Sequence, residues 1–221
     1  MLVTYRPAAD QSVIVPAQGS GTLSQLSRHV FRAQVNNEIA KDARWWFETG
    51  LGPMISDGVV TRNSLLNEPV VTLDDNDPMR TDILHEYFVP PGRFNDFITA
   101  CQEVIPSSYQ ELLNITLRYV AADSESILSY APAPRIACVM LFSQELTQRA
   151  EADHERMTRD LIDRVLDLGG TYYLPYRPHA TLDQFRRAYP NAEKFVEEKK
   201  FYDPDLVFRN GFWDRYLANM A

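Results

Sequence analysis

Between residues 84 and 174 the hydrophobic pattern of the chain alternates between the two-residue period of a strand and the 3.6-residue period of a helix. The expected strands are residues 84–90, 114–121, 126–130, 135–143 and 171–174, and the expected helices are residues 91–105 and 145–168. With one extra hairpin strand, this order is the split βαβ pattern of a ferredoxin-like fold. We therefore predict an α+β fold with an antiparallel sheet and helices on one face.

The strand expected at residues 114–121 has the clearest alternation. Ile115 and Leu117 point to one face, and Thr116 and Arg118 point to the other. The two amphipathic helices should cover the apolar face. Thr116 and Arg118 are therefore expected on the face that the helices leave open.

Two parts are expected along the chain, residues 1–80 and 81–221. The first contains an extended arm at residues 1–20, a long helix from Thr22 to Phe47 and an irregular connection at residues 53–82. The second contains the sheet and ends in a helical tail.

The tail has two helix signals. Thr181 and Gln184 form a capping-box signature for a short helix that ends near Tyr189. A further helix is expected at residues 191–201, and Asp203-Pro204 should end it.

Composition excludes several classes of protein. The formal charge of −8 would repel a nucleic-acid backbone. The longest apolar run, residues 136–142, is too short to span a membrane, and the N-terminus lacks a basic stretch followed by an apolar one, so we expect a cytoplasmic protein. Cys101 and Cys138 have no zinc-binding spacing and are expected to be buried, reduced and structural, with no metal site.

Arg118 is the first candidate for chemistry. An arginine within an alternating strand places a permanent cation at a fixed point on a sheet face, where it can bind a carboxylate, a carbonyl oxygen or an anionic flavin ring. The alternative is a solvated surface arginine, whose electrostatic contribution is small. Glu86, in the strand expected at residues 84–90, either forms an ion pair with such an arginine or acts as a base.

Residues 172–179 contain more polar aromatic side chains than a core strand needs, which favours the lining of a site. His179 can donate or accept a proton near neutral pH, although a lone histidine is more often structural. The hydroxyl of Thr181 is expected to cap the following helix. Gly19-Ser20-Gly21 lacks the lysine and the context of a phosphate-binding loop, and the central segments contain no HExxH motif and no nucleophile elbow.

Six short segments together resemble a known family. They are His85-Glu86-Tyr87-Phe88-Val89-Pro90, Ile115-Thr116-Leu117-Arg118, Arg177-Pro178-His179, Tyr189-Pro190, Asp203-Pro204 and Phe208-Arg209-Asn210. Over residues 80–217 they resemble the C-terminal half of FAD-linked oxidases of the vanillyl-alcohol-oxidase superfamily, especially its sugar and aldonolactone oxidase branch.

The resemblance implies a substrate-binding cap over the reactive face of FAD, which a separate N-terminal domain or subunit mainly holds. An alcohol, sugar-like or hydroxy-acid substrate would pass a hydride to the flavin. The residues implied in catalysis are Arg118, Glu86 and His179. Those implied in substrate binding are Thr116, Tyr130, Tyr176 and Arg177, and those implied in cofactor binding are His179 and Asn210.

Two positions depart from the family, because Thr116 stands where it has a glutamate and Leu182 where it has a lysine. The family's FAD domain, with its glycine-rich pyrophosphate loop, is not found in these residues. We therefore expect a fragment, a truncated gene product or one subunit of a split enzyme, which alone is colourless and inactive.

The alternative function is a stand-alone ferredoxin-like binding or interaction module without catalysis. Clustering of Arg118, His179 and Asn210 on one concave face would favour the oxidase cap, and dispersal would favour the module. A homo-oligomer is compatible with both functions.

Overall fold

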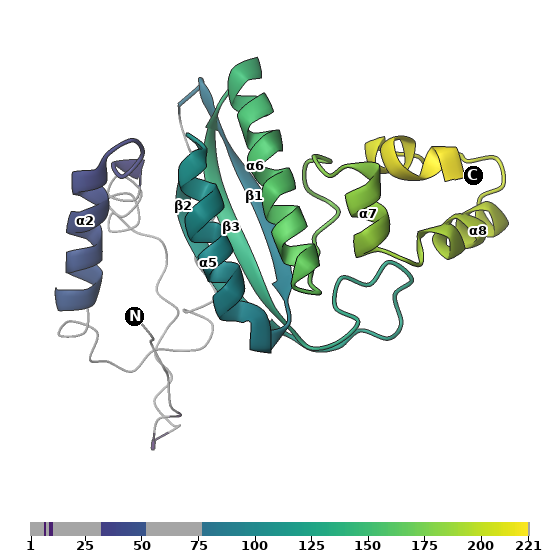
Figure 1. The fold of residues 1–221 in the computed structure, drawn as a ribbon, viewed down its shortest axis with the longest axis horizontal. Helices are drawn as coiled ribbons and strands as arrows, with labels where there is room; N and C mark the ends of the chain where they lie inside the picture. The colour runs from purple at the N-terminus through teal and green to yellow at the C-terminus, as the bar shows by residue number, and fades with distance from the viewer. Residues whose placement is uncertain (1–6, 8, 11–31, 52–76, 221) are drawn as a thin grey trace. The chain divides into compact units, whose positions relative to one another are not determined.

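The computed structural model describes residues 7, 9–10, 32–51 and 77–220, and the chain divides into two compact units, Met1–Pro78 and Met79–Ala221 (Figure 1). Most of the arm predicted at residues 1–20 and of the connection predicted at residues 53–82 lies outside the described residues. The described part of the first unit contains helix α2 (Glu38–Trp46) and the π-helical turn η1 (Phe47–Leu51).

The helix predicted from Thr22 to Phe47 is not continuous in its described part, because α2 is helical but residues 33–36 form a turn. Asn36 has φ +54°, which interrupts a right-handed helix. Asn37 then begins α2, because its Oδ1 accepts a hydrogen bond from the backbone N–H of Ala40 at 3.1 Å. The apolar period runs through this point in the sequence, but the two asparagines favour a turn and a cap.

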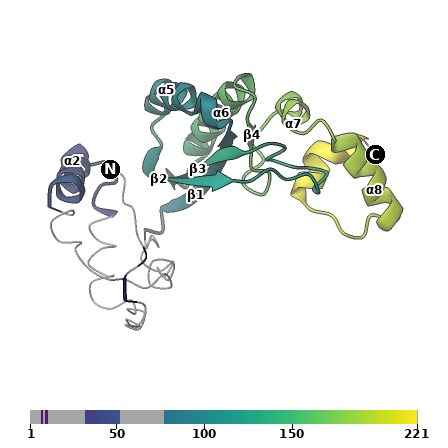
Figure 2. The same ribbon diagram turned by 90° about the horizontal axis from the view of Figure 1, so that it is seen from below.

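The second unit contains a four-stranded sheet. Its strands are β1 (Arg80–Val89), β2 (Glu111–Val120), β3 (Arg135–Glu145) and β4 (Thr171–Tyr172). They lie in the order β2-β3-β1-β4, and every pair is antiparallel. With α5 (Phe94–Val104) after β1 and α6 (Gln148–Asp167) after β3, this confirms the predicted α+β fold with ferredoxin-like strand order. Figure 2 shows both helices on one face of the sheet.

The core lies between this helix layer and the sheet. It contains Tyr87 from β1, Cys138 and Met140 from β3, Phe97 from α5 and Leu161 from α6, all almost fully buried. Each large apolar side chain buried in this way contributes roughly 1.5–3 kcal/mol. Cys101 is also buried, and neither cysteine forms a disulfide.

The two helices that cover the sheet begin at local signals in the sequence. Pro91 opens the short 3-10 turn η3 (Pro91–Arg93) before α5, and a second such turn, η4 (Ile105–Ser107), follows it. Thr147 caps α6, since its hydroxyl accepts a hydrogen bond from the N–H of Ala150.

The strand predicted at residues 126–130 is wrong, because this segment forms part of a loop between β2 and β3. Asp123 organises the loop: its Oδ1 accepts hydrogen bonds from the N–H groups of Glu125 and Ser126. The hydroxyl of Ser129 donates to the carbonyl of the same Asp123. These local bonds satisfy polar groups that a strand would have used in a ladder, so the described sheet has no extra hairpin.

The tail is helical, as predicted. Helix α7 (Leu182–Ala188) begins with the complete Thr181–Gln184 capping box, which confirms that prediction. It is followed by α8 (Ala192–Tyr202), the π-helical turn η5 (Trp213–Leu217) and the 3-10 turn η6 (Ala218–Met220). Phe185 of α7 stacks on Tyr216 at 4.9 Å, so the tail shares the core of the sheet.

Candidate functional site

The sheet face opposite α5 and α6, called here the open face, carries the first group of candidates. Glu86 of β1 is paired with Val139 of β3, and Val139 is paired with Thr116 of β2. The neighbouring row across the sheet contains Phe88, Ala137 and Arg118. Thr116 and Arg118 thus occupy the face that the alternation predicts.

Between Glu86 and Arg118 the floor of the open face is formed by the central strand, β3. The central strand contributes only Val139 and the small Ala137 at this point. Strand and row spacings place the Cα atoms of Glu86 and Arg118 roughly 12 Å apart, a separation that two long side chains facing each other can bridge through a small bound molecule.

Four aromatic rings, called here the aromatic row, border this floor. Phe88 stacks on Tyr130 with ring centroids 4.3 Å apart, and Tyr173 meets Tyr130 edge-on at 5.4 Å. Tyr176 continues the row, 5.2 Å from Tyr173. The three tyrosines are half-buried, so the row presents ring faces and hydroxyl groups together.

The open face carries two opposite charges, those of Glu86 and Arg118, which lie in different surroundings. Burial raises the pKa of Glu86, and nearby Arg118 lowers it by less. Arg118 is exposed, and within the described residues its guanidinium has no hydrogen bond or ion pair. Burial and the charge of Glu86 also raise the pKa of Tyr176, while Arg118 lowers it.

Together, Glu86, Thr116, Arg118 and the aromatic row are called here the open-face site. The geometry combines an acid with a raised pKa, a cation open to an anionic group, hydroxyl groups and a flat aromatic border. Such a surface can bind a planar or anionic molecule and accept a proton from it.

His179, which was predicted to act in catalysis and in cofactor binding, does not belong to the open-face site. It is 5% exposed and lies on the helix side of the sheet, where its ring is 5.7 Å from that of His85. His85 points to the helices because it alternates with Glu86 along β1. Burial lowers the pKa of His179, although Glu151 opposes this effect.

Arg177, predicted to bind substrate, is also held on the helix side. Its Nη1 donates to Oε2 of Glu151 on α6. Glu151 accepts from His179 Nε2 through its other oxygen at 2.9 Å. Both candidates are therefore engaged in a contact within the chain.

Three buried histidines meet beside these contacts. The ring of His154 lies 4.9 Å from that of His85 and 5.6 Å from that of His179. Thr158 Oγ1 lies 3.3 Å from His179 Nδ1 and 3.4 Å from His85 Nε2. Burial above all lowers the pKa of His154 to about 4, and that of His85 well below its ordinary value. The three rings are therefore predominantly neutral at pH 7.

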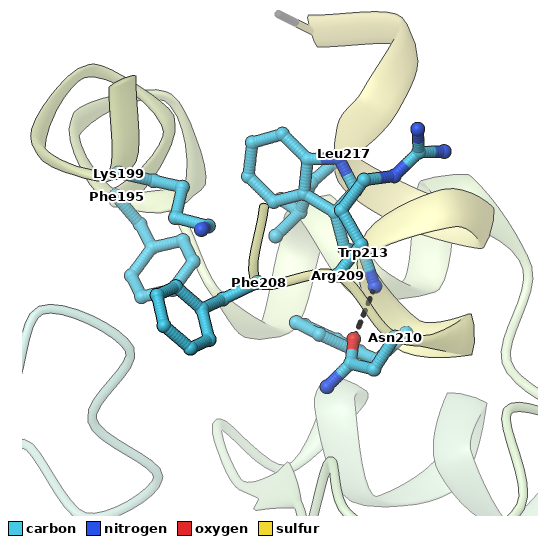
Figure 3. Close-up of a pocket in the computed structure, with 8 residues that line it drawn as sticks. Phe195, Lys199, Phe208, Arg209, Asn210, Trp213 and Leu217 are labelled. Carbon is cyan, nitrogen blue, oxygen red and sulfur yellow. Dashed lines mark hydrogen bonds between the residues drawn. The ribbon is translucent and has the colours of Figure 1, made fainter. Parts of the chain in front are cut away.

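Asn210, predicted to contact the cofactor, lies in the tail. Its Oδ1 accepts a hydrogen bond from the backbone N–H of Trp213, the first residue of η5, at 2.9 Å (Figure 3). It lines a cavity of about 250 Å³ together with Phe195, Lys199, Phe208, Arg209, Phe212, Trp213 and Leu217. The polar groups Lys199 and Arg209 are already paired with Asp203 and Asp214. Asn210 is thus separate from both the open-face site and the histidines.

The structure brings together Glu86, Thr116, Arg118, Tyr130 and Tyr176 but not His179, Arg177 or Asn210. Sequence reasoning missed Glu151, His154 and Thr158. A signal for them exists, because these three polar residues share one side of a helix whose buried stripe is otherwise apolar.

The sequence matches neither the models of known protein families nor any curated protein with which it was compared. Within residues 7, 9–10, 32–51 and 77–220, no group of histidine, cysteine and acidic side chains is arranged to hold a metal ion. In the same residues no helix has both the length and the apolar character to cross a membrane.

Proposed function

We propose that this chain is the substrate-binding cap of an FAD-dependent oxidoreductase that acts on an alcohol, sugar-like or hydroxy-acid substrate. The observation that carries the proposal is the open cation of Arg118, which lies on the same sheet face as half-buried Glu86 and the aromatic row. An N-terminal FAD-binding domain or subunit would be the main holder of the cofactor.

The residues of the open-face site fit an isoalloxazine ring. The ring is planar, and the half-buried tyrosine rings of the aromatic row offer it a flat border. Arg118 offers a positive charge without a partner among the described residues, and this suits a ring that gains electron density on reduction. When bound, the flavin accepts the hydride that leaves the substrate carbon.

The chain's own residues would bind and orient the substrate. Arg118 would hold developing negative charge, because a fixed cation costs no reorganisation during the reaction. A carboxylate oxygen of Glu86 would accept the proton of the substrate hydroxyl, since its raised pKa brings it closer to that task. Tyr130, Tyr176 and Thr116 would orient the hydroxyl by hydrogen bonds.

Arg118→Met in the enzyme assembled from this chain and its flavin-binding part tests the proposal. Stopped-flow flavin reduction should slow by roughly a hundred- to a thousandfold, as when one electrostatic donor is removed. Substrate binding should weaken by less, because the interaction grows toward the transition state.

Arg93→Met is the matched control. Arg93 is an exposed arginine paired with Asp96 beside α5, away from the open face. In the Arg93→Met enzyme the flavin should be reduced at the parent rate. Both variants should have the melting temperature of the parent. If the Arg118→Met enzyme reduces its flavin at the parent rate, this strand has no catalytic role.

The stand-alone binding module is the second candidate, and one observation favours it. Arg118, His179 and Asn210 are dispersed over three separate places in the second unit. We favour the cap because Glu86, Thr116, Tyr130 and Tyr176 nevertheless gather around Arg118. If the chain binds a partner protein that contains no flavin, and binds no FAD-containing protein, that result would support the module instead.

A further inference from the structure

Residues 173–180, called here the strap, connect the two faces of the sheet. At its start the N–H of Tyr173 donates to the carbonyl of Glu86 at 2.9 Å, on the outer edge of β1. Tyr176 then lies on the open face, because its ring meets that of Tyr173 at 5.2 Å and Tyr173 meets Tyr130 of the aromatic row; the charges of Glu86 and Arg118 both affect its pKa. His179 lies on the helix side, so the strap passes around the edge of β1 (the loop before α7 in Figure 1).

On the helix side, one carboxylate binds two residues of the strap. Glu151 Oε2 accepts from Arg177, and Oε1 accepts from His179 at 2.9 Å. Gln144 of β3 donates to Oε2 at 2.8 Å, which fixes the orientation of the carboxylate. Glu151 is ionised at neutral pH, because these hydrogen bonds and charges lower its pKa despite its partial burial.

Further contacts hold the end of the strap, beyond Tyr176. Arg159 donates to the carbonyl of His179 at 2.8 Å, and Tyr216 donates to the carbonyl of Ala180 at 2.9 Å. Thr158, His85 and His154 face the ring of His179, and Glu155 lies near it in a pair with Arg159. Between Tyr173 and His179, the described side-chain bond that restrains the strap is that of Arg177 to Glu151.

We propose that Glu151 is a positioning residue for the open-face site: by clasping Arg177 and His179 on the helix side, it sets Tyr176 beside Glu86 and Arg118 on the other side. Glu151 has no contact with the open face itself and acts through the strap. The inference rests on the proposed function only in treating the open face as a working site.

Fluorine NMR of the chain labelled with 3-fluorotyrosine tests the placement without any flavin. The Tyr176→Phe variant assigns the Tyr176 signal, and exposed Tyr202 serves as an internal reference. In the parent chain, the phenol of Tyr176 should titrate at a higher pH than an ordinary 3-fluorotyrosine does, because burial and the charge of Glu86 raise its pKa. In Glu151→Gln, which keeps one acceptor oxygen, the Tyr176 signal should move toward that of an exposed tyrosine, and its titration midpoint should fall toward that of an ordinary 3-fluorotyrosine.

Glu151→Ala removes both acceptors and should give the same shift more completely. Asp163→Asn is the matched control, because Asp163 is another α6 acid that binds an arginine from a following segment, Arg187. It should leave the Tyr176 signal unchanged.

Two results would overturn the proposal. The first is a Tyr176 signal that keeps its parent position and midpoint in both Glu151 variants. The second is a change in which the signals of core Tyr87 and Tyr172 move together with Tyr176, since Glu151 would then support the whole fold. Because no flavin is present, either result leaves the Arg118 test of the proposed function intact.

Discussion

Acid should destabilise this protein through His154. Its ring is fully buried, and neither ring nitrogen has a hydrogen-bond partner within the described residues. Burial, followed by the neighbouring His179, lowers its pKa to about 4 from an ordinary 6.5. The unfolded chain therefore binds a proton at a higher pH than the folded chain does. The free energy of unfolding must fall as pH falls below 6.5, and this loss levels off near pH 4.

The size of the effect follows from the two pKa values. Between pH 7.5 and pH 5, this one histidine lowers the free energy of unfolding by about 2 kcal/mol, and over its full range by roughly 3 kcal/mol. The lowered pKa values of His85 and His179 act in the same direction, so the parent protein should lose more than this.

His154→Met isolates the contribution. Methionine fills a similar space with an apolar side chain and leaves no hydrogen-bonding group newly unpaired. Urea unfolding at pH 7.5 and pH 5 should show a loss of stability about 2 kcal/mol smaller in the variant than in the parent. Equal losses in the two proteins, at equal urea dependence, would refute the reasoning.

Two further predictions concern packing and the cofactor. Gly170→Ala should destabilise the chain strongly, because a Cβ at this position would lie 2.4 Å from the carbonyl oxygen of Phe88. Gly92→Ala should be tolerated, because a Cβ there would have no atom within 4 Å, and the melting temperatures of the two variants test the difference. Residues 1–221 purified alone should show no flavin absorbance and no oxidase turnover, since the sequence contains no glycine-rich pyrophosphate-binding motif, and a stoichiometric yellow cofactor would contradict this.

The sheet and its two covering helices were predictable because their signals are periodic. The alternation around Arg118 and the apolar stripe of Phe97 and Cys101 each specify a face, and tertiary packing agrees with them. Where local polar bonds compete with periodicity, prediction failed. Hydrogen bonds to Asp123 form a loop where a strand was expected. The positive φ of Asn36 and the cap formed by Asn37 interrupt the expected helix.

The candidate site was predictable only where a strand fixes direction. Glu86, Thr116 and Arg118 follow from alternation, since β-strand side chains change face at every residue. His179 and Arg177 lie in a segment without a period, so the sequence does not show that the strap changes face between Tyr176 and His179. Their partner Glu151 comes from a helix, and pairs between separate elements depend on the tertiary fold.

The strand order β2-β3-β1-β4 has a consequence for the route of folding. β2 and β3 are neighbours in the sequence, and the loop organised by Asp123 joins them, so their pairing closes a short loop. β1 instead pairs with β3 and β4, which come roughly 50 and 85 residues later, and such long-range pairings are slow to form because more chain entropy is lost. A β2–β3 hairpin that carries Arg118 should therefore form early, and Glu86 should join it only when β1 enters the sheet, so the two charges of the open face meet late on the folding pathway.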